Sequence, residues 1–351
     1  MSDASSSDEP LGASVSRPNA VIFGCAGEAL STAERDFFVA VRPVGFILFR
    51  RNCRAPDQVR DLVASLRDCI ARSEAPVLID QEGGRVARLR PPYWRRYPAA
   101  AEIAELPDPM AEEAARLGAR LIADDLGRLG INVDCLPVLD LPADGADPVI
   151  GDRAYGSNPD RVARLGRAVC EGLLEGGVMP VLKHIPGHGR ARVDSHLTLP
   201  TVEAGHAELA CTDFAPFRAL AAMPWAMTAH IVYMAIDPTA PATQSARVIN
   251  EVIRGEIGFG GVLVSDDLSM RALAGDLPER AGRALAAGCD LVLHCNGRLD
   301  EMVALIPAVP PVSAATEARL ARAENLRKPS GILDRGAAEA RFDTLIGRVP
   351  R

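Results

Sequence analysis

Short apolar runs of strand length alternate along this chain with longer segments whose apolar residues recur with a helical period. Eight runs have the length and composition of buried strands, at 20–25, 45–49, 76–80, 132–137, 179–184, 226–231, 261–266 and 290–295. The segments between them predict helices, among them 110–129, 160–174, 213–222, 243–257 and 277–287. Strand and helix therefore alternate over most of the chain.

Two of the earlier helices also carry recognisable local signals. Ser31 and Glu34 have the spacing of a capping box, in which each side chain accepts a backbone N–H of the first helical turn. After Asp57, residues Val59 and Leu62 begin an apolar stripe on one helical face. These signals support helices after the first and second predicted strands.

The alternation predicts an α/β fold, a single (β/α)8 TIM-type barrel with a C-terminal helical tail. Right-handed crossovers place each strand beside the previous one, and eight such units close on themselves. A doubly wound open sheet is the alternative, but no GxGxxG follows the first strand and no GxxxxGK[ST] occurs. We expect a disordered tail at 1–19, the catalytic barrel at 20–305 and, after Pro307, a helical extension at 306–351 packed on the barrel.

The composition favours a folded protein that binds neither nucleic acid nor a membrane. Of the 351 residues, 48% are hydrophobic and 24% are charged, which suffices for a large core. The net charge is −7, and the basic residues are scattered rather than gathered in a phosphate-binding patch. No apolar run approaches the ~20 residues that cross a bilayer.

The cysteines and the amino terminus predict a cytoplasmic protein. The eight cysteines stand singly, without a CxxC pair, mostly in apolar segments, and this favours reduced thiols. Residues 1–19 lack the basic and apolar regions of a secretory signal. We expect a monomer.

Polar residues gather where four of the predicted strands end. They lie at 80–85, 151–153, 183–196 and 265–267. In a (β/α)8 barrel, reactive side chains occupy the carboxyl ends of the strands and the loops that follow them. We therefore expect these four segments to form one site.

The adjacent carboxylates Asp266 and Asp267 are expected to have different roles. Side chains alternate in direction along a strand, so only one of the two can point into the barrel mouth. The other is available to cap a helix that would begin near Leu268.

The segment from Lys183 to His196 holds three of the six histidines and allows two kinds of chemistry. One is a metal site of His184, His188, Asp194 and His196, although Pro186 argues against a helix that presents the first two together. The other is acid–base catalysis by His196, because Asp194 lies close enough to bond its imidazole and raise its basicity. A purely structural alternative is that His184 and His188 only anchor the loop by hydrogen bonds, and this alternative is favoured for His188 more than for His184.

Asp80 and the arginines near it fit a sugar or a plain ion pair equally well. Asp80 ends a predicted strand, and Arg85 and Arg88 follow it closely. A carboxylate beside guanidinium groups can bond several hydroxyl groups, but it can also pair internally. For Arg153 a surface position is the default expectation.

Together these strings resemble those of glycoside hydrolase family 3, most closely its single-domain bacterial β-N-acetylglucosaminidases of peptidoglycan recycling. The resemblance covers about residues 21–296 and keeps the family's order. The matching strings are GFILF at 45–49, DQEGGRV at 80–86, KHIPGHG at 183–189, DSH at 194–196 and SDDLSM at 265–270. The departures are Ile185, where an aromatic residue is common, and the basic residues Arg190 and Arg192.

The resemblance implies a role for each matching residue. Asp266 would be the nucleophile, and His196, assisted by Asp194, would be the acid/base. The residues that would hold the N-acetylglucosamine ring are Asp80, Arg88, Arg153, Lys183 and His184.

The expected function is retaining hydrolysis of terminal non-reducing N-acetylglucosamine from GlcNAc-1,6-anhydro-N-acetylmuramic acid, with or without peptide. No cofactor and no metal are expected, and the partner is this small glycan. The alternatives are a phosphorylase that uses phosphate as acceptor, a metal-dependent hydrolase, and a sugar-binding regulator without activity.

Overall fold

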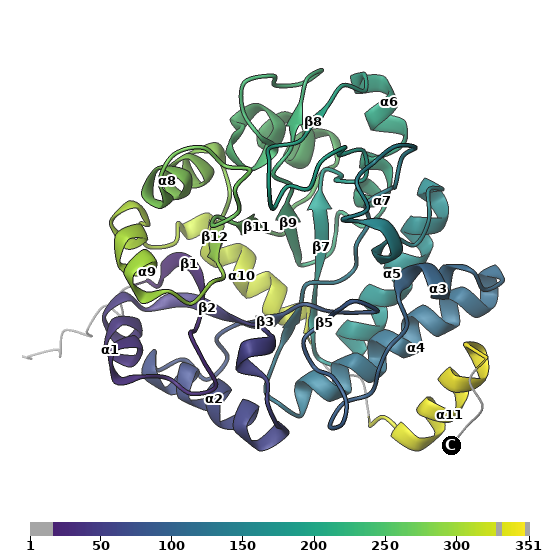
Figure 1. Cartoon of the computed structure of the whole chain (residues 1–351), viewed down its shortest axis with the longest axis horizontal. Coiled ribbons are helices and arrows are strands. Elements are labelled where there is room, and N and C mark those ends of the chain that lie inside the picture. The colour runs from purple at the N-terminus through teal and green to yellow at the C-terminus, as the bar shows by residue number, and fades with distance from the viewer. Residues whose placement is uncertain (1–16, 328–331, 348–351) are drawn as a thin grey trace, which may run out of the picture.

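Eight parallel strands form a closed barrel in the computed structural model, which describes residues 17–327 and 332–347 (Figure 1). The (β/α)8 prediction is confirmed, and the open sheet is excluded. Around the barrel the strands follow the order β1, β12, β11, β9, β7, β6, β3 and β2. Their bounds are Asn19–Gly24 (β1), Pro43–Leu48 (β2), Val77–Ile79 (β3), Val133–Asp134 (β6), Met179–Ile185 (β7), Trp225–Thr228 (β9), Val262–Asp267 (β11) and Leu291–His294 (β12).

Helices surround the strands because their apolar stripes bury against the outer face of the barrel. The helices that follow the strands are Thr32–Val41 (α1), Pro56–Cys69 (α2), Ala100–Ala104 (α3), Asp108–Gly127 (α4), Pro159–Glu175 (α5), His206–Cys211 (α6), Phe214–Ala219 (α7), Leu277–Ala287 (α8) and, after the last strand, Leu299–Leu305 (α9). The capping box predicted at Ser31 and Glu34 is present at the start of α1. In α2 the predicted stripe is buried, with Val59 and Leu62 in the core.

The helix predicted at 243–257 differs from the observed structure. Residues Ala242–Gln244 form a short 3-10 turn, and a π-helix follows at Val248–Glu256. The Thr243 hydroxyl is buried and contacts the side chains of Thr228 and His230. A regular helix therefore does not begin here, because Thr243 is turned toward the barrel.

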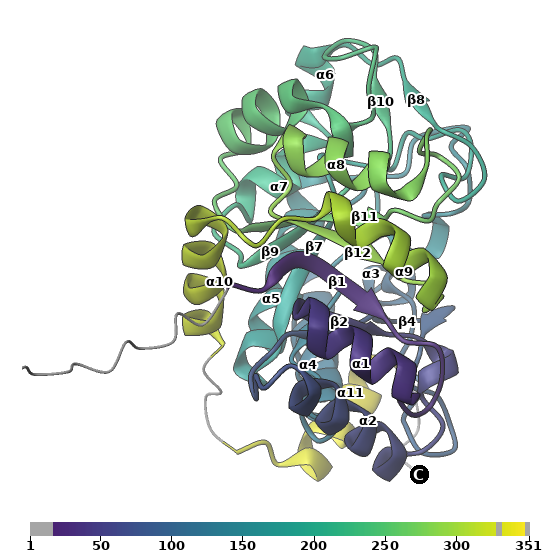
Figure 2. The same cartoon turned by 90° about the vertical axis from the view of Figure 1, so that its left-hand side faces the viewer.

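Short strand pairs extend the loops at the carboxyl ends of the barrel strands. The strands Gln81–Gly83 (β4) and Val86–Ala87 (β5) form an antiparallel hairpin after β3. Thr201–Val202 (β8) and Val232–Tyr233 (β10) pair in parallel and tie the loop after β7 to the loop after β9. Figure 2 shows β8 and β10 beyond the barrel, on the side away from α10.

The helix Ala314–Leu326 (α10) lies at the amino ends of the strands, and β1 runs away from it (Figure 2). Arg319 pairs with Asp290 just before β12, and Arg322 bonds the carbonyl of Gly260 before β11. The amino-terminal end of the barrel is therefore closed by α10. The carboxyl-terminal end is formed by the loops that carry the polar segments 80–85, 151–153, 183–196 and 265–267.

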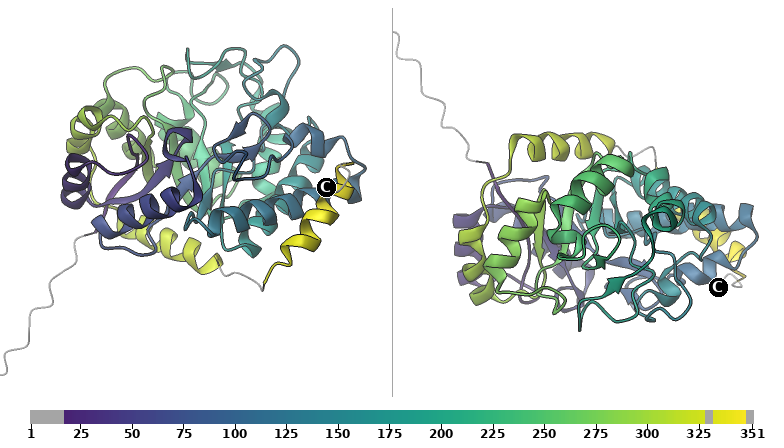
Figure 3. Two further views of the ribbon diagram at one scale, coloured as in Figure 1. Left: turned by 60° about the horizontal axis from the view of Figure 1, so that its bottom comes forward. Right: turned by 90° about the horizontal axis from the view of Figure 1, so that it is seen from above.

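The helix Arg335–Leu345 (α11) packs against α4 on the side of the barrel (Figure 3). The ring of Phe342 lies over Gly118 of α4, and Asp343 pairs with Arg95. Residues 1–16 of the predicted tail lie outside the described residues, and β1 already begins at Asn19. No helix among residues 17–327 and 332–347 is long and apolar enough to cross a membrane.

Candidate active site

The carboxylate of Asp80, directly after β3, lies between two cations. Its Oδ1 accepts a hydrogen bond from Lys183 Nζ at 2.8 Å, and its Oδ2 accepts one from Arg88 Nη2 at 2.8 Å. Burial would raise the pKa of Asp80, but the charges of Lys183 and Arg88 hold it well below its usual range. Asp80 is therefore ionised and oriented by residues from two different strand ends.

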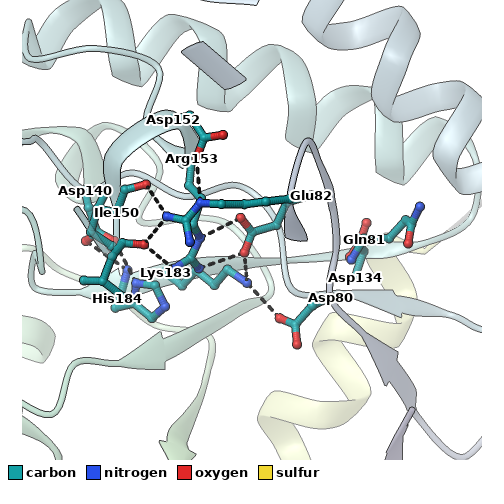
Figure 4. Close-up of polar contacts among 12 residues, drawn as sticks. Asp80, Gln81, Glu82, Asp134, Asp140, Ile150, Asp152, Arg153, Lys183 and His184 are labelled. Carbon is teal, nitrogen blue, oxygen red and sulfur yellow. Dashed lines mark hydrogen bonds and ion pairs between the residues drawn. The ribbon is translucent and has the colours of Figure 1, made fainter. Parts of the chain in front are cut away.

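Glu82 in β4 joins this cluster from the hairpin, and sequence analysis missed it. Its Oε1 lies 2.6 Å from Lys183 Nζ, and its two oxygens accept both Nε and Nη2 of Arg153 at 2.8 Å (Figure 4). The side chains of Glu82 and Arg153 are only 5% and 11% exposed, so the surface position expected for Arg153 is wrong. The sequence did contain a signal for Glu82, because this residue lies in the same polar segment, 80–85, as Asp80.

A glutamine fixes the shape of this hairpin. Gln81 Oε1 accepts the backbone N–H groups of Arg88 and Leu89, and its Nε2 donates to the Leu89 carbonyl. These bonds hold Arg88 in position to reach Asp80.

His184, near the end of β7, is held by a buried carboxylate that sequence analysis also missed. Asp140 Oδ2 lies 2.7 Å from His184 Nδ1, and Asp140 Oδ1 accepts the backbone N–H groups of His184 and His188 (Figure 4). Burial would raise the pKa of Asp140, but the neighbouring His184 lowers it below its usual value. With Nδ1 bonded to Asp140, the Nε2 of His184 is the nitrogen left for a ligand.

The two adjacent acids of β11 do have different surroundings. Asp267 Oδ1 accepts the backbone N–H groups of Ser269 and Cys295, and Oδ2 accepts the Ser269 hydroxyl, so Asp267 supports the loop. The helix expected near Leu268 is absent, since turns follow β11 and α8 is capped by Asp276 instead. Asp267 thus stabilises a turn and caps no helix.

Three histidines act electrostatically on Asp266. Burial would raise its pKa, but His230 and His184 hold it below its usual value, and His196 also contributes. His230, at the end of β9, was not singled out from the sequence; its Nδ1 lies 2.7 Å from Thr243 Oγ1 and its Nε2 3.1 Å from the Asp267 carbonyl. Asp266 is therefore a charged carboxylate at the carboxyl ends of the strands, within electrostatic reach of three imidazoles.

Asp194 and His196 form the hydrogen bond that their spacing predicts. Asp194 Oδ1 lies 2.7 Å from His196 Nδ1 and also accepts the His196 backbone N–H at 2.8 Å. The His196 side chain is 62% exposed, and its Nε2 is the nitrogen that Asp194 does not bond. This geometry suits an imidazole that exchanges a proton with a bound molecule.

The histidines and acids of the 183–196 segment do not form a metal site. Among the described residues, no group of three or more His, Cys, Asp and Glu side chains is placed to hold a metal ion. His184 and His188 instead bond to Asp140 and Ser195.

At the carboxyl end of the closed (β/α)8 barrel lie the charged Asp266 and the Asp194–His196 pair, groups of the kind that act as nucleophile and as acid/base. The model of the glycosyl hydrolase family 3 N terminal domain matches residues 29–325, and the chain belongs to this family. The expected family is thereby confirmed, and the chain is an enzyme of the glycoside hydrolase class.

Proteins of similar sequence have names that specify the activity more closely than the family does. The chain is 40% identical over 309 residues to a beta-hexosaminidase of Alkalilimnicola ehrlichii, covering 86% of this chain and 87% of the relative. It is 40% identical over 282 residues to a beta-hexosaminidase of Pseudomonas aeruginosa, covering 80% of this chain and 83% of the relative. The chain groups with the beta-hexosaminidases of its family.

Solved structures agree with this grouping. NagZ from Neisseria gonorrhoeae, in complex with N-trifluoroacetyl-D-glucosamine, superposes with a TM-score of 0.84 at 34% identity, covering 94% of this chain and 98% of that one. A family 3 beta-N-acetylglucosaminidase from Paenibacillus sp. str. FPU-7 superposes with a TM-score of 0.82 at 33% identity, covering 93% of this chain and 66% of that longer chain.

Proposed function

We propose that this protein is a retaining β-N-acetylhexosaminidase that removes terminal non-reducing N-acetylglucosamine from GlcNAc-1,6-anhydro-N-acetylmuramic acid, with or without attached peptide, in peptidoglycan recycling. The observation that carries the proposal is the ionised Asp266 within electrostatic reach of the His196–Asp194 pair. The names of the similar proteins support the choice of sugar.

In the first step Asp266 attacks the anomeric carbon of the bound sugar. The bond from this carbon to the leaving oxygen breaks, and His196 donates the proton on Nε2 to that oxygen. The pKa of Asp194 lies below its usual value, because the hydrogen bonds from His196 and the charge of its ring outweigh the effect of burial. The Asp194 carboxylate is therefore charged and stabilises His196 while the ring carries its proton.

In the second step His196 takes a proton from water, and that water attacks the anomeric carbon of the glycosyl-enzyme. The bond to Asp266 breaks, so the carboxylate is regenerated and the sugar leaves with its original configuration.

The ion-paired cluster supplies the sugar site in this proposal. Asp80, Arg88, Arg153, Lys183 and His184 present fixed donors and acceptors to the hydroxyl and acetamido groups of the ring. Burial would lower the pKa of Lys183, but Asp80 and Glu82 raise it above its usual value, so the ammonium keeps its charge. A cluster held by its own ion pairs loses little side-chain freedom when a sugar binds.

A covalent trapping experiment tests the nucleophile and the sugar class together. A fluorinated N-acetylglucosamine analogue that slows the second step is incubated with the protein, and the labelled peptide is mapped by mass spectrometry. We expect the label on Asp266 and none in Asp266→Asn. A label on another carboxylate refutes the assignment of Asp266.

A phosphorylase is the second candidate, since the acid/base of this site is an imidazole and not a carboxylate. A neutral or positive ring repels an incoming phosphate less than a second carboxylate would. Adding phosphate to the reaction and analysing the product separates the two functions, because a phosphorylase releases N-acetylglucosamine 1-phosphate and a hydrolase releases the free sugar.

We also propose that the protein acts in the cytoplasm as a monomer. All eight cysteines are free, as is usual in a reducing compartment. Cell fractionation and light scattering of the purified protein test the two statements.

A further inference from the structure

The serine between the two proposed acid/base residues is turned into the protein. Ser195 is 2% exposed, whereas the side chains of its neighbours Asp194 and His196 are 29% and 62% exposed. Ser195 is the only buried residue from position 192 to position 199. The segment that carries the proposed acid/base is thus anchored by one inward side chain.

Hydrogen bonds lead to the same conclusion. Ser195 Oγ lies 2.9 Å from His188 Nε2. The backbone bonds of Leu197 and Thr198 go to the Asp194 carbonyl, inside the segment. Among the described residues, the Ser195–His188 bond is the one hydrogen bond that joins residues 192–199 to the rest of the protein.

The outer face of the segment has little support. Arg192, Val193 and Thr198 line an open hollow of about 580 Å³. The side chain of Leu197, next to His196, is largely exposed. Among the described residues of this segment, only Ser195 is buried, so its bond to His188 is the clearest attachment of the segment.

His188 is itself rigidly placed. Its backbone N–H donates to Asp140 Oδ1 at 2.6 Å, and the same carboxylate bonds His184. Burial and the nearby His184 lower the pKa of His188 to about 4, so the ring is neutral at neutral pH. Its Nδ1 is buried and has no partner among the described residues, which favours the tautomer whose Nε2–H donates to Ser195.

We propose that the hydrogen bond between His188 and Ser195 positions His196 for proton transfer to the leaving group. Ser195 and His188 are then positioning residues that do not touch the substrate. The contacts run from His184 through Asp140 and His188 to Ser195, so the proposed sugar site and the proposed acid/base share one rigid support. This inference rests on the proposed function of His196.

The variant Ser195→Ala tests the bond, with Thr198→Ala as the matched control because it deletes an exposed hydroxyl from the same segment. Rates are measured with two N-acetyl-β-glucosaminides, one with a phenyl and one with a 2,4-dinitrophenyl leaving group. Only the phenyl leaving group depends on a proton from the enzyme. We expect Ser195→Ala to lower kcat/KM for the phenyl substrate roughly tenfold, equivalent to about 1.4 kcal/mol, and to change the dinitrophenyl rate little.

A second pair of variants tests the other end of the bond. His188→Gln keeps a donor near the position of Nε2, and His188→Leu removes it. We expect the glutamine variant to keep more activity toward the phenyl substrate than the leucine variant. Thermal unfolding of each variant identifies any that fail to fold.

Limited proteolysis reports directly on the segment. Arg192 is exposed three residues before Ser195, and trypsin cleaves after it when the segment opens. We expect faster cleavage after Arg192 in Ser195→Ala than in Thr198→Ala, measured by mass spectrometry.

The outcomes separate this inference from the proposed function. One outcome is that His196→Ala slows the phenyl substrate far more than the dinitrophenyl substrate, while Ser195→Ala hydrolyses both substrates, and is cleaved by trypsin, at the same rates as Thr198→Ala. In that case the positioning role is refuted and the proposed function stands. If Ser195→Ala lowers both substrates equally, the bond acts on folding or on sugar binding, and the positioning role is again refuted. If the wild-type protein hydrolyses neither substrate, the proposed function fails.

Discussion

Replacing Glu82 by glutamine removes one negative charge from a cluster in which two carboxylates hold three cations. Lys183 keeps Asp80 as a partner, but Arg153 loses its only ion pair among the described residues. Removing one partner of a buried ion pair costs about 3–5 kcal/mol. The amide oxygen of glutamine can still accept one of the two bonds from Arg153, so we expect the lower end, about 3 kcal/mol of unfolding free energy.

Urea unfolding followed by tryptophan fluorescence measures this loss. Glu175→Gln is the matched control, because Glu175 pairs with Arg116 on the surface, where such a pair contributes less than about 1 kcal/mol. If Glu82→Gln loses no more stability than Glu175→Gln, the cluster does not depend on Glu82 and the reasoning is refuted.

The pH dependence provides an independent test of the same pair. Burial would raise the pKa of Glu82, but Lys183 and Arg153 hold it below the ordinary value of 4.5. A carboxylate with a depressed pKa stabilises the folded state fully above its ordinary value, and this contribution is lost as the pH falls toward the folded-state pKa. The difference in stability between wild type and Glu82→Gln should therefore shrink below about pH 4.5; a difference that grows would contradict the ion pair.

Three further changes test other parts of the molecule. His196→Ala should slow hydrolysis of a phenyl N-acetyl-β-glucosaminide by about 10²–10⁴-fold and that of the dinitrophenyl substrate far less; equal losses would contradict its role as acid/base. Asp140→Asn should cost about 1–3 kcal/mol of stability and raise KM, since His184 loses its carboxylate; an unchanged KM would separate Asp140 from the sugar site. Phe342→Ala should cost about 3–5 kcal/mol in urea unfolding, because this fully buried ring joins α11 to α4, while kcat stays unchanged; a lower kcat would show that α11 affects the site.

Much of the fold could be predicted because strands and helices carry local periodicity. The apolar runs at 45–49 and 261–266 correspond to β2 and β11, and the capping box at Ser31 starts α1. The helix predicted at 243–257 begins only at about residue 246 and is mostly a π-helix, because Thr243 bonds to residues on β9 and its loop and no local pattern reveals such a partner. The helix expected after Asp267 failed for the same reason, since that carboxylate bonds the distant backbone of Cys295.

By itself the sequence determined which polar segments follow the barrel strands. It also determined the hydrogen bond between Asp194 and His196, because these residues are only two positions apart. Only the tertiary structure decided which side chains of these segments form ion pairs and hydrogen bonds with one another. Glu82 bonds Arg153, which is 71 residues away in the sequence, and Asp140 bonds His184, which is 44 residues away. The physical reason is that closure of the barrel brings the carboxyl ends of β3, β6 and β7 side by side. A buried charge then pairs with the opposite charge that this closure places near it, because a buried charge without a partner is strongly destabilising.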